Sequence, residues 1–361
     1  MSNNVKYANK SNLGYISLIK NIALLLVILG HAGCIYAGKW QCDVVNNNSN
    51  LIKYITEYIY SFHMPLFVFV SGYIYSYSKN ILKKYNCKNA FIINKCKRLI
   101  VPYLITSILF MIPIQMIFNV YKDGDRSYIN RVIFDIVLAK RPAHLWYLIM
   151  LFNIFIIFIF IEKYTKTNKY ITNILLLLFI SIVSIKIPNV YQISSTFKYL
   201  LYFYIGYIIC EDNNIKQKLI KNKDTFFILH ILVFNIMYFF INTNSENIII
   251  KIITVVVTPI LSIFAIGWIY VYVIQLYNKN IYVKIINNKF YKLIDKHNFN
   301  IYLVHQPIML SLISILKNIA LSPSVLYIIL FTITLFISII ASVLILTINK
   351  YINKINYKIS N

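Results

Sequence analysis

Residues 16–37 read ISLIKNIALLLVILGHAGCIYA, an apolar segment that is long enough to cross a lipid bilayer as one α-helix. The segment holds two ionisable side chains, Lys20 near its start and His31 in its second half. The interval between them is about three helical turns, so both side chains lie on one helix face, about 16 Å apart along the axis. We therefore predict one ionisable group at the membrane surface and the other within the membrane on the same face.

The composition of the chain is that of an integral membrane protein. Of its 361 residues, 59% are hydrophobic and 13% are charged, and the mean hydropathy is +0.66. Soluble proteins have about 25% charged residues. Because the apolar segments extend through most of the chain, we predict a single membrane-embedded domain over residues 1–361. The formal net charge of +25 does not indicate nucleic-acid binding, since the basic residues fall between apolar segments rather than in a basic arm.

Ten apolar segments are predicted to span the membrane as α-helices. They cover residues 16–37, 53–77, 99–120, 143–161, 170–187, 196–210, 225–242, 248–276, 298–317 and 324–349. With the N-terminus inside, 24 Lys and Arg residues fall in cytoplasmic segments and 11 on the other side, which follows the positive-inside rule. The sequence therefore predicts an all-α polytopic membrane protein, a single bundle of about ten transmembrane helices. Both termini are predicted to be cytoplasmic, with tails at residues 1–15 and 350–361.

Two connecting segments differ from ordinary loops. Residues 121–142 form the longest segment on the predicted outer side and carry both basic and acidic side chains, so we expect this segment to lie over the bundle on the outer surface. Residues 279–296 mix lysines with apolar side chains, which predicts an interfacial helix on the inner face.

The five cysteines do not indicate a metal site or a thiol redox site. The sequence has no CxxC pair and no His at zinc-finger spacing, so we predict no metal site. A disulfide between Cys34 and Cys42 outside the membrane remains an alternative to free thiols.

Ionisable side chains within apolar spans are the first candidates for function, because placing them in a membrane is unfavourable. His31 lies in the first span, and His63 and Ser71 lie about two turns apart in the second. Pro65 is predicted to kink the second helix, either to line a cavity or for packing alone. His230 is expected to make a polar contact within the bundle.

Basic side chains gather near the predicted cytoplasmic interface. Lys95, Lys97 and Arg98 precede the third span, and Lys20 lies near the start of the first. Such a cluster either signals topology and contacts anionic membrane lipid, or binds the phosphates of a nucleotide-like donor. The residues alone leave both interpretations open.

Five short motifs occur along the chain in the order found in the integral-membrane acyltransferase family 3, which this chain resembles. They are Lys20 with Gly30-His31, FHMPLFVFVSGY at 62–73, RLIVPY at 98–103, HLWYL at 144–148 and IYLVH at 301–305. Each motif is weak alone, and their common order over spans one to four and nine carries the resemblance.

The resemblance implies a multi-pass enzyme of the bacterial cytoplasmic membrane that transfers an acyl group to a hydroxyl of a cell-surface polysaccharide or its sugar precursor. The donor is usually acetyl-CoA, a co-substrate, so no permanently bound cofactor is expected. The catalytic histidine would be His31. Expected partners are acyl-CoA, a sugar or polysaccharide acceptor and membrane lipid. The acceptor, the acyl group and the formation of a homo-oligomer stay open.

Two departures from the family pattern concern Lys20. Many members have Arg at this position and an acidic residue three positions earlier, where this chain has Ser17. Lysine keeps the charge but lacks the planar fork of arginine, and without the acid its orientation must come from elsewhere. The motif of two Arg three apart in some members corresponds here to Lys95 and Arg98. With Lys97, these cations are predicted to bind the donor.

The chemistry predicted is direct transfer without an acyl-enzyme, since no GxSxG, metal-ligand or Walker motif is present. A neutral His31 would accept the proton of a sugar hydroxyl as its oxygen attacks the thioester. His63, Ser71, Trp146 and His305 are candidates to bind the acceptor or stabilise the oxyanion. The main alternative is an exporter or transporter of a polysaccharide or lipid-linked sugar, although spans five to eight are almost purely apolar.

Overall fold

The computed structural model describes residues 2–40, 48–85, 87–118, 126–165, 170–243, 247–277 and 279–359, which contain helices and no β-strand. The α-helices are α1 (Ser2–Ala32), α2 (Asn50–Tyr60), α3 (His63–Ser76), α4 (Lys88–Lys95), α5 (Val101–Thr106), α6 (Ile112–Ile117), α7 (Tyr128–Asn130), α8 (Trp146–Thr165), α9 (Tyr170–Val183), α10 (Ile193–Glu211), α11 (Asn213–Lys221), α12 (Lys223–Thr243), α13 (Ile248–Tyr277), α14 (Asn280–Asn287), α15 (Lys289–Leu316) and α16 (Pro323–Ile359). The π-helical segments are η1 (Tyr77–Ile81), η2 (Cys96–Ile100), η3 (Ser107–Met111) and η4 (Arg131–Val137), and the 3₁₀ turns are η5 (Ala143–Leu145), η6 (Ser184–Lys186) and η7 (Val190–Gln192).

Eight helical stretches among the described residues are long and apolar enough to cross a membrane. They are Gly14–Ala32, Lys88–Ile117, Ala143–Thr165, Val190–Glu211, Lys223–Thr243, Ile248–Tyr277, Lys289–Leu316 and Pro323–Ile348. Each overlaps a predicted span, which confirms the all-α polytopic class. The predicted span 170–187 corresponds to a shorter apolar helix, Tyr170–Lys186, and 53–77 is divided. The total number of spans and the side of each terminus stay predictions.

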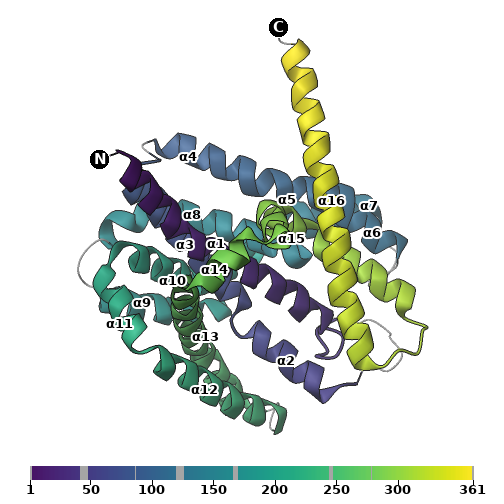
Figure 1. Ribbon diagram of the computed structural model, residues 1–361. Helices are drawn as coiled ribbons and strands as arrows, with labels where there is room; N and C mark the ends of the chain where they lie inside the picture. The colour runs from purple at the N-terminus through teal and green to yellow at the C-terminus, as the bar shows by residue number, and fades with distance from the viewer. Residues whose placement is uncertain are drawn as a thin grey trace.

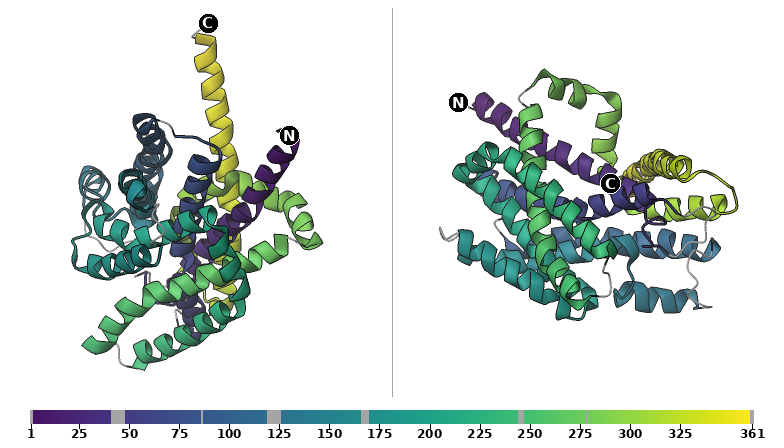
Figure 2. Two further views of the ribbon diagram at one scale, coloured as in Figure 1. Left: turned by 90° about the vertical axis from the view of Figure 1, so that its left-hand side faces the viewer. Right: turned by 90° about the horizontal axis from the view of Figure 1, so that it is seen from below.

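Figure 1 shows α1 running across the body of the molecule, and α16 extending well beyond it. The two views in Figure 2 show α12 and α13 side by side as an antiparallel pair. One hydrophobic core includes buried side chains from most of these helices, from α1 to α16, and α12 packs on it through α13. The described helices therefore pack around one interior rather than around two.

The second predicted span breaks into two helices instead of bending as one. Helix α2 ends at Tyr60, and α3 begins at His63, with Phe62 in a non-helical conformation between them. Pro65 is the third residue of α3, where its missing N–H is one of the donors that has no partner within a helix anyway. Ser262 Oγ from α13 donates to the free carbonyl of Ser61 at 2.7 Å. The proline therefore starts a new helix, and His63 comes to lie at its first turn.

Helices α3 and α10 form the closest helix pair. A Cβ on Gly72 would lie 2.0 Å from the carbonyl oxygen of Phe203, and one on Gly206 would lie 2.1 Å from that of Phe69. Glycines at such contacts let two backbones approach closely, as is common between helices in membranes. Helix α10, which is the shortest predicted span, therefore lies at the centre of the bundle and fixes the position of α3.

The segment predicted to lie over the bundle instead folds back along the preceding helix in its described part. Tyr128 donates its hydroxyl to the carbonyl of Ile108 at 2.7 Å, and Tyr103 donates to that of Ile136 at 2.8 Å. These contacts place α7 and η4 antiparallel to α5 and η3, within a stretch long enough to span a membrane. The apolar side chains within 128–137 explain the difference, since they provide a face that can pack beside the preceding helix.

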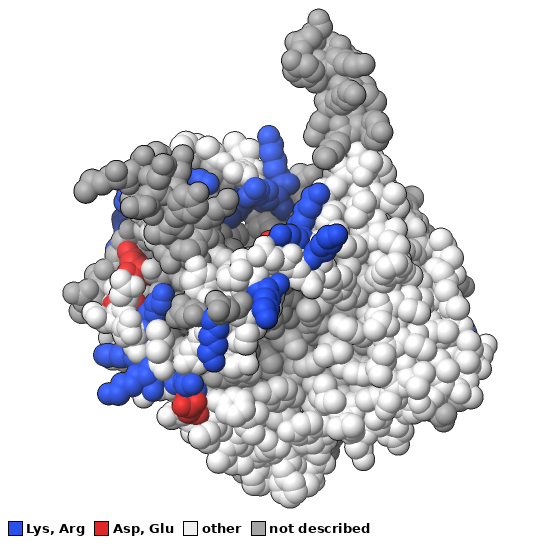
Figure 3. All heavy atoms as spheres, in the orientation of Figure 1, with Lys and Arg blue, Asp and Glu red and all other residues white. Residues whose placement is uncertain are grey.

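The predicted interfacial helix at 279–296 is also divided. Helix α14 ends at Asn287, because the side chain of Asn288 accepts from the amides of Phe290 and Tyr291 and so begins α15. The lysines that follow belong to the first turns of α15. Figure 3 shows Lys and Arg gathered in a band across this face, while the lower right part of the surface is almost without charge.

Candidate active site

A cavity of about 540 Å³ lies at the end of α1, and we call it the histidine cavity. The side chains that contribute its polar and aromatic atoms include His31, His63, His144, Trp146, Tyr302 and Gln306. His31 lies in the last turn of α1, and His63 lies at the start of α3. His144 belongs to η5, directly before α8, and α15 provides Tyr302 and Gln306. Three helix ends and the middle of α15, which are far apart in the sequence, therefore meet at one cavity.

Three histidine rings lie next to one another at this site. The ring centroid of His305 is 5.1 Å from that of His31 and 5.0 Å from that of His144. Trp40 covers another edge of His31, with ring centroids 5.3 Å apart. His305 is fully buried, so it lies behind the cavity wall that His31 and His144 form.

Backbone carbonyls fix the tautomers of the surrounding histidines. His305 Nδ1 donates to the carbonyl of Tyr302 at 2.7 Å. His144 Nε2 donates to the carbonyl of Leu303 at 2.9 Å, and His63 Nδ1 donates to a carbonyl one turn earlier at 2.9 Å. Because a carbonyl only accepts, each bonded nitrogen carries the hydrogen, and the other nitrogen of a neutral ring keeps a lone pair. These three rings therefore present acceptors.

Pro307 explains why the Leu303 carbonyl is free to bind His144. In an α-helix the N–H of residue 307 would donate to this carbonyl, and proline has no N–H. Gln306 Oε1 in turn accepts from the His144 backbone amide at 2.9 Å. One proline inside α15 thus creates the docking point that holds His144 at the cavity.

Several imidazole nitrogens at the site are buried without a hydrogen-bond partner among the described residues. They are His31 Nδ1, His144 Nδ1 and His305 Nε2. Buried polar atoms are nearly always paired, so unpaired nitrogens on His31 and His144, which line the cavity, indicate a place for a bound polar molecule. The arrangement suits proton transfer to His31 and hydrogen bonds from hydroxyl groups.

At the other end of the α1 span, Lys20 forms an ion pair with Asp295 of α15, with Nζ 3.2 Å from Oδ1. Ser17 donates to the same carboxylate, and Asn21 Nδ2 donates to it at 3.1 Å. Asn298 also donates to Asn21 at 2.8 Å. Helix α15 therefore supplies the acidic partner that is missing at position 17.

A second cavity of about 530 Å³, which we call the apolar cavity, lies beside this end of α1. Its lining is mostly apolar and includes Leu18, Asn21, Leu25, Ile285, Tyr291 and Ile294. Asn21 joins this cavity to the Lys20–Asp295 pair. An apolar cavity with a cation and amide groups at its edge is suited to a ligand that has an apolar chain and an anionic end.

The remaining predicted donor cations lie elsewhere. The ammonium of Lys95 is 3.7 Å from the centre of the Phe155 ring, a cation–π contact. Lys97 and Arg98 lie on η2, where Arg98 is exposed and Lys97 also reaches the surface. In the described part of the chain no hydrogen bond or ion pair joins any of the three to Lys20.

Some of the predicted acceptor residues lie at the histidine cavity, and one does not. Trp146 and His63 line the histidine cavity, and His305 lies directly behind it. Ser71 is not part of this lining, and its hydroxyl lies 3.0 Å from the carbonyl of Phe67 and 3.2 Å from the Tyr147 hydroxyl.

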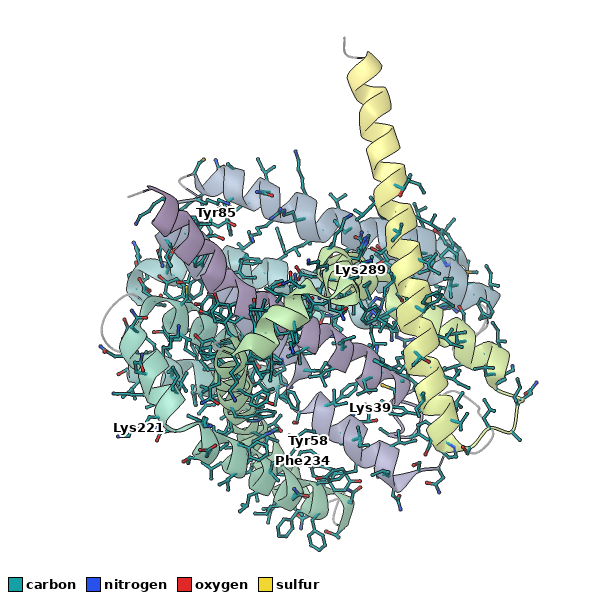
Figure 4. The ribbon with its side chains drawn as sticks, in the orientation of Figure 1. Lys39, Tyr58, Tyr85, Lys221, Phe234 and Lys289 are labelled. Carbon is teal, nitrogen blue, oxygen red and sulfur yellow. The ribbon has the colours of Figure 1, made fainter. Side chains whose placement is uncertain are left out.

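Sequence reasoning gave no role to several residues that the structure places at the site. His144 had a signal, since it begins a span and belongs to a matched motif. Asp295 had a weaker sequence signal, because it is an acidic residue close to the start of an apolar span. Lys39, which follows α1 (Figure 4), lines the histidine cavity and forms an ion pair with Glu57 at 3.1 Å.

His230 lies outside the histidine cavity. Its Nδ1 accepts from the indole N–H of Trp268 at 3.1 Å and lies 3.2 Å from the Tyr58 hydroxyl. Tyr58 on α2 in turn packs against Phe234 on α12, with ring centroids 5.0 Å apart (Figure 4). This histidine therefore joins α2, α12 and α13.

The cysteines and histidines do not form a metal site in the part of the chain that the structure describes. Cys34 is a thiol that forms no disulfide with a described residue, and its sulfur lies 2.8 Å from the Tyr60 hydroxyl. Cys42, the other half of the considered disulfide, falls outside the described residues.

Comparison with known proteins shows to which family the chain belongs. A family model described as an acyltransferase domain matches residues 13–346. No curated protein and no solved structure matches the chain. The match covers nearly the whole chain, including every helix that contributes to the histidine cavity. The chain is therefore a multi-pass membrane protein of acyltransferase family 3.

Proposed function

We propose that this protein is an O-acyltransferase of the bacterial cytoplasmic membrane, which moves an acetyl group from acetyl-CoA to a hydroxyl of a cell-surface polysaccharide or its sugar precursor. The observation that carries the proposal is the position of His31. Its Nδ1 is buried and unpaired at a cavity, and the same helix holds Lys20 about three turns away.

His31 acts as the general base. It takes the proton of the acceptor hydroxyl as that oxygen forms a bond to the thioester carbonyl carbon. The tetrahedral intermediate then expels the CoA sulfur, which receives the proton from the His31 imidazolium. The products are the O-acyl sugar and free CoA thiol, and His31 returns to its neutral form.

The surrounding side chains divide into hydrogen-bond acceptors and donors. His63 and His144 use one ring N–H each on a backbone carbonyl, so their remaining nitrogens accept hydrogen bonds and suit sugar hydroxyls. His305, held in the same way, packs behind the cavity wall against the His31 ring. The indole N–H of Trp146 only donates, which suits the carbonyl oxygen of the thioester as it becomes an oxyanion.

Lys20 binds the phosphates of the donor. Asp295 and Ser17 orient its ammonium group, and the apolar cavity beside it accepts the apolar part of the pantetheine arm. Lys97 and Arg98 at the surface and the stacked Lys95 are then left to contact lipid headgroups or the outer part of the nucleotide.

The test uses the purified protein in lipid nanodiscs with labelled acetyl-CoA and the surface glycans of the host cell. His31→Gln should lower the rate of acetyl transfer by roughly 100-fold or more, the usual contribution of a general base. His230→Gln is the matched control, since it replaces a buried histidine outside the cavity and should keep near wild-type activity. Normal transfer by His31→Gln would refute the mechanism. Transport of the glycan across vesicle membranes in the absence of acetyl-CoA, together with no acetyl transfer to the glycan, would favour the exporter.

A further inference from the structure

A cavity of about 580 Å³ adjoins the histidine cavity, and we call it the arginine cavity. Ala143, Trp146 and Tyr199 line both cavities. Arg141 lines the arginine cavity and lies three residues before His144 in the same short connection. A molecule that extends from one cavity into the other would therefore pass along Trp146.

The charges of the arginine cavity are unbalanced. Among the described residues, three cations line it, Arg131, Arg141 and Lys198, and one carboxylate, Asp135. Asp135 already has a partner outside the lining, since Arg126 Nη1 lies 3.2 Å from its Oδ1. Arg131 and Lys198 thus give the described part of the lining an excess of positive charge where part of the wall is buried, and such charge attracts anions most strongly when water is partly excluded.

Arg131 is the clearest sign of a missing ligand. Its side chain is only 8% exposed, and its one hydrogen bond to the described chain is a long one from Nε to the Arg126 carbonyl, at 3.4 Å. A guanidinium group has five donors, so most of those of Arg131 have no partner among the described residues. Lys198 is half-buried and has no carboxylate partner among the described residues. Both groups therefore suit a bound oxyanion.

The backbone around this cavity is held in uncommon conformations. Ala139, Ala143, Tyr191 and Gln192 all have positive φ, between 46° and 60°. The side-chain amide of Gln192 donates to the Ala139 carbonyl at 3.3 Å and so ties two of these points together. Non-glycine residues with positive φ are uncommon and gather at ligand sites, where the surrounding structure maintains them. Ala143 lies on the boundary between the two cavities.

We infer that the arginine cavity binds an oxyanion of the acceptor, a carboxylate or a phosphate, while the neighbouring hydroxyl reaches His31. This inference rests on the proposed function for the identity of the acceptor. The enzyme would then select acidic glycans, either with uronic-acid carboxylates or with phosphodiester groups, over neutral ones.

The position of the cavity favours the acceptor over the donor. An acyl-CoA with its phosphates at Lys20 and its acyl end at His31 occupies the α1–α15 side of the site. The arginine cavity is built instead from the segment around η4, the Arg141–Ala143 connection and the start of α10. It therefore stays available to a second substrate.

The experiment measures binding of three probes of four units each to the full protein in nanodiscs. The probes are a glucuronic-acid tetrasaccharide, a glycerol-phosphate tetramer and neutral maltotetraose. We expect at least one acidic probe to bind, more weakly at high salt, and maltotetraose to bind at least tenfold more weakly. Binding of the preferred acidic probe identifies which oxyanion is recognised.

Variants then test the cations. Arg131→Gln and Lys198→Gln should each weaken binding of the acidic probe about tenfold and leave acetyl-CoA binding unchanged, since one ionic contact is worth about this factor. Lys140→Gln is the control, because it removes an exposed cation next to Arg141 that does not line the cavity. If Arg131→Gln does not fold, the less buried Lys198→Gln gives the result.

Equal binding of acidic and neutral probes would overturn the inference, as would binding of none of them. Loss of acetyl-CoA affinity in Arg131→Gln or Lys198→Gln would also overturn it, by assigning the cavity to the donor. A different result would contradict the proposed function. In that case the wild-type protein would neither bind nor consume acetyl-CoA, whichever probe it binds.

Discussion

The two ends of the α1 span differ in how their polar groups are satisfied. At the Lys20 end, the ammonium has an ionic partner in Asp295, which also accepts from Ser17 and Asn21. At the His31 end, the imidazole has a buried nitrogen without a partner among the described residues, beside two other rings in the same state. A paired group is oriented for binding, whereas an unpaired group is available for chemistry. Under the proposed function, the contrast corresponds to recognition at one end of α1 and proton transfer at the other.

The largest effect expected at the Lys20 end is that of removing its charge. Lys20→Ala should raise the KM for acetyl-CoA by about 10- to 100-fold, the value of a charge-assisted contact, with a smaller change in kcat. Steady-state kinetics with a saturating acceptor would measure both. A fall in kcat with an unchanged KM would break the contrast between the two ends, since Lys20 would then act in the chemical step.

Asp295→Asn should raise the same KM by a smaller factor, about tenfold or less, because it keeps the ammonium but removes the charge that orients it. A double-mutant cycle with Lys20→Ala would show the coupling, since Asp295→Asn should add little once the lysine is gone. Additive effects of the two substitutions would mean that the carboxylate acts on the donor independently of Lys20.

At the other end, Pro307→Ala restores a backbone N–H that competes with His144 for the Leu303 carbonyl. We expect kcat to fall several-fold, about 1 kcal/mol, with the KM for acetyl-CoA unchanged. The matched control is Pro259→Ala, which changes a proline inside α13 that does not line the histidine cavity. Equal losses in both variants would point to general helix straightening.

The smallest effect is expected for Lys20→Arg. Arginine keeps the charge and adds a planar fork for phosphate, so the KM for acetyl-CoA should stay within about twofold or fall. A marked loss of activity would contradict phosphate binding by this residue and would favour a purely structural pair with Asp295.

Much of the architecture could be predicted because apolar length is a local property of the sequence. Eight of the ten predicted segments correspond to helices that are long enough to span. Pro65 predicts a kink in the second span, but not the full break before His63, where the carbonyl of Ser61 is satisfied by the hydroxyl of Ser262 from a distant helix. The antiparallel packing of η4 beside η3 could not be predicted either. It depends on hydrogen bonds from Tyr103 and Tyr128 to backbone carbonyls that lie 20 or more residues away in the sequence.

The candidate site was predictable where a polar residue interrupts an apolar span. His31, His63 and His305 stand out in this way, and the structure brings them close to one cavity. Asp295 was not recognised, because its partner Lys20 lies on a helix at the other end of the chain. The arginine cavity could not be predicted either. Its cations lie on η4, in the Arg141–Ala143 connection and on α10, and they come together only in the folded chain.

The most direct test of the division along α1 is the position of a bound donor. A cryo-EM structure of the protein with a non-hydrolysable acetyl-CoA analogue should place the phosphates at Lys20 and the acetyl carbonyl carbon next to His31. Density for the analogue should run along α1 between these two side chains. Phosphates in the arginine cavity, or an acetyl group away from His31, would contradict it.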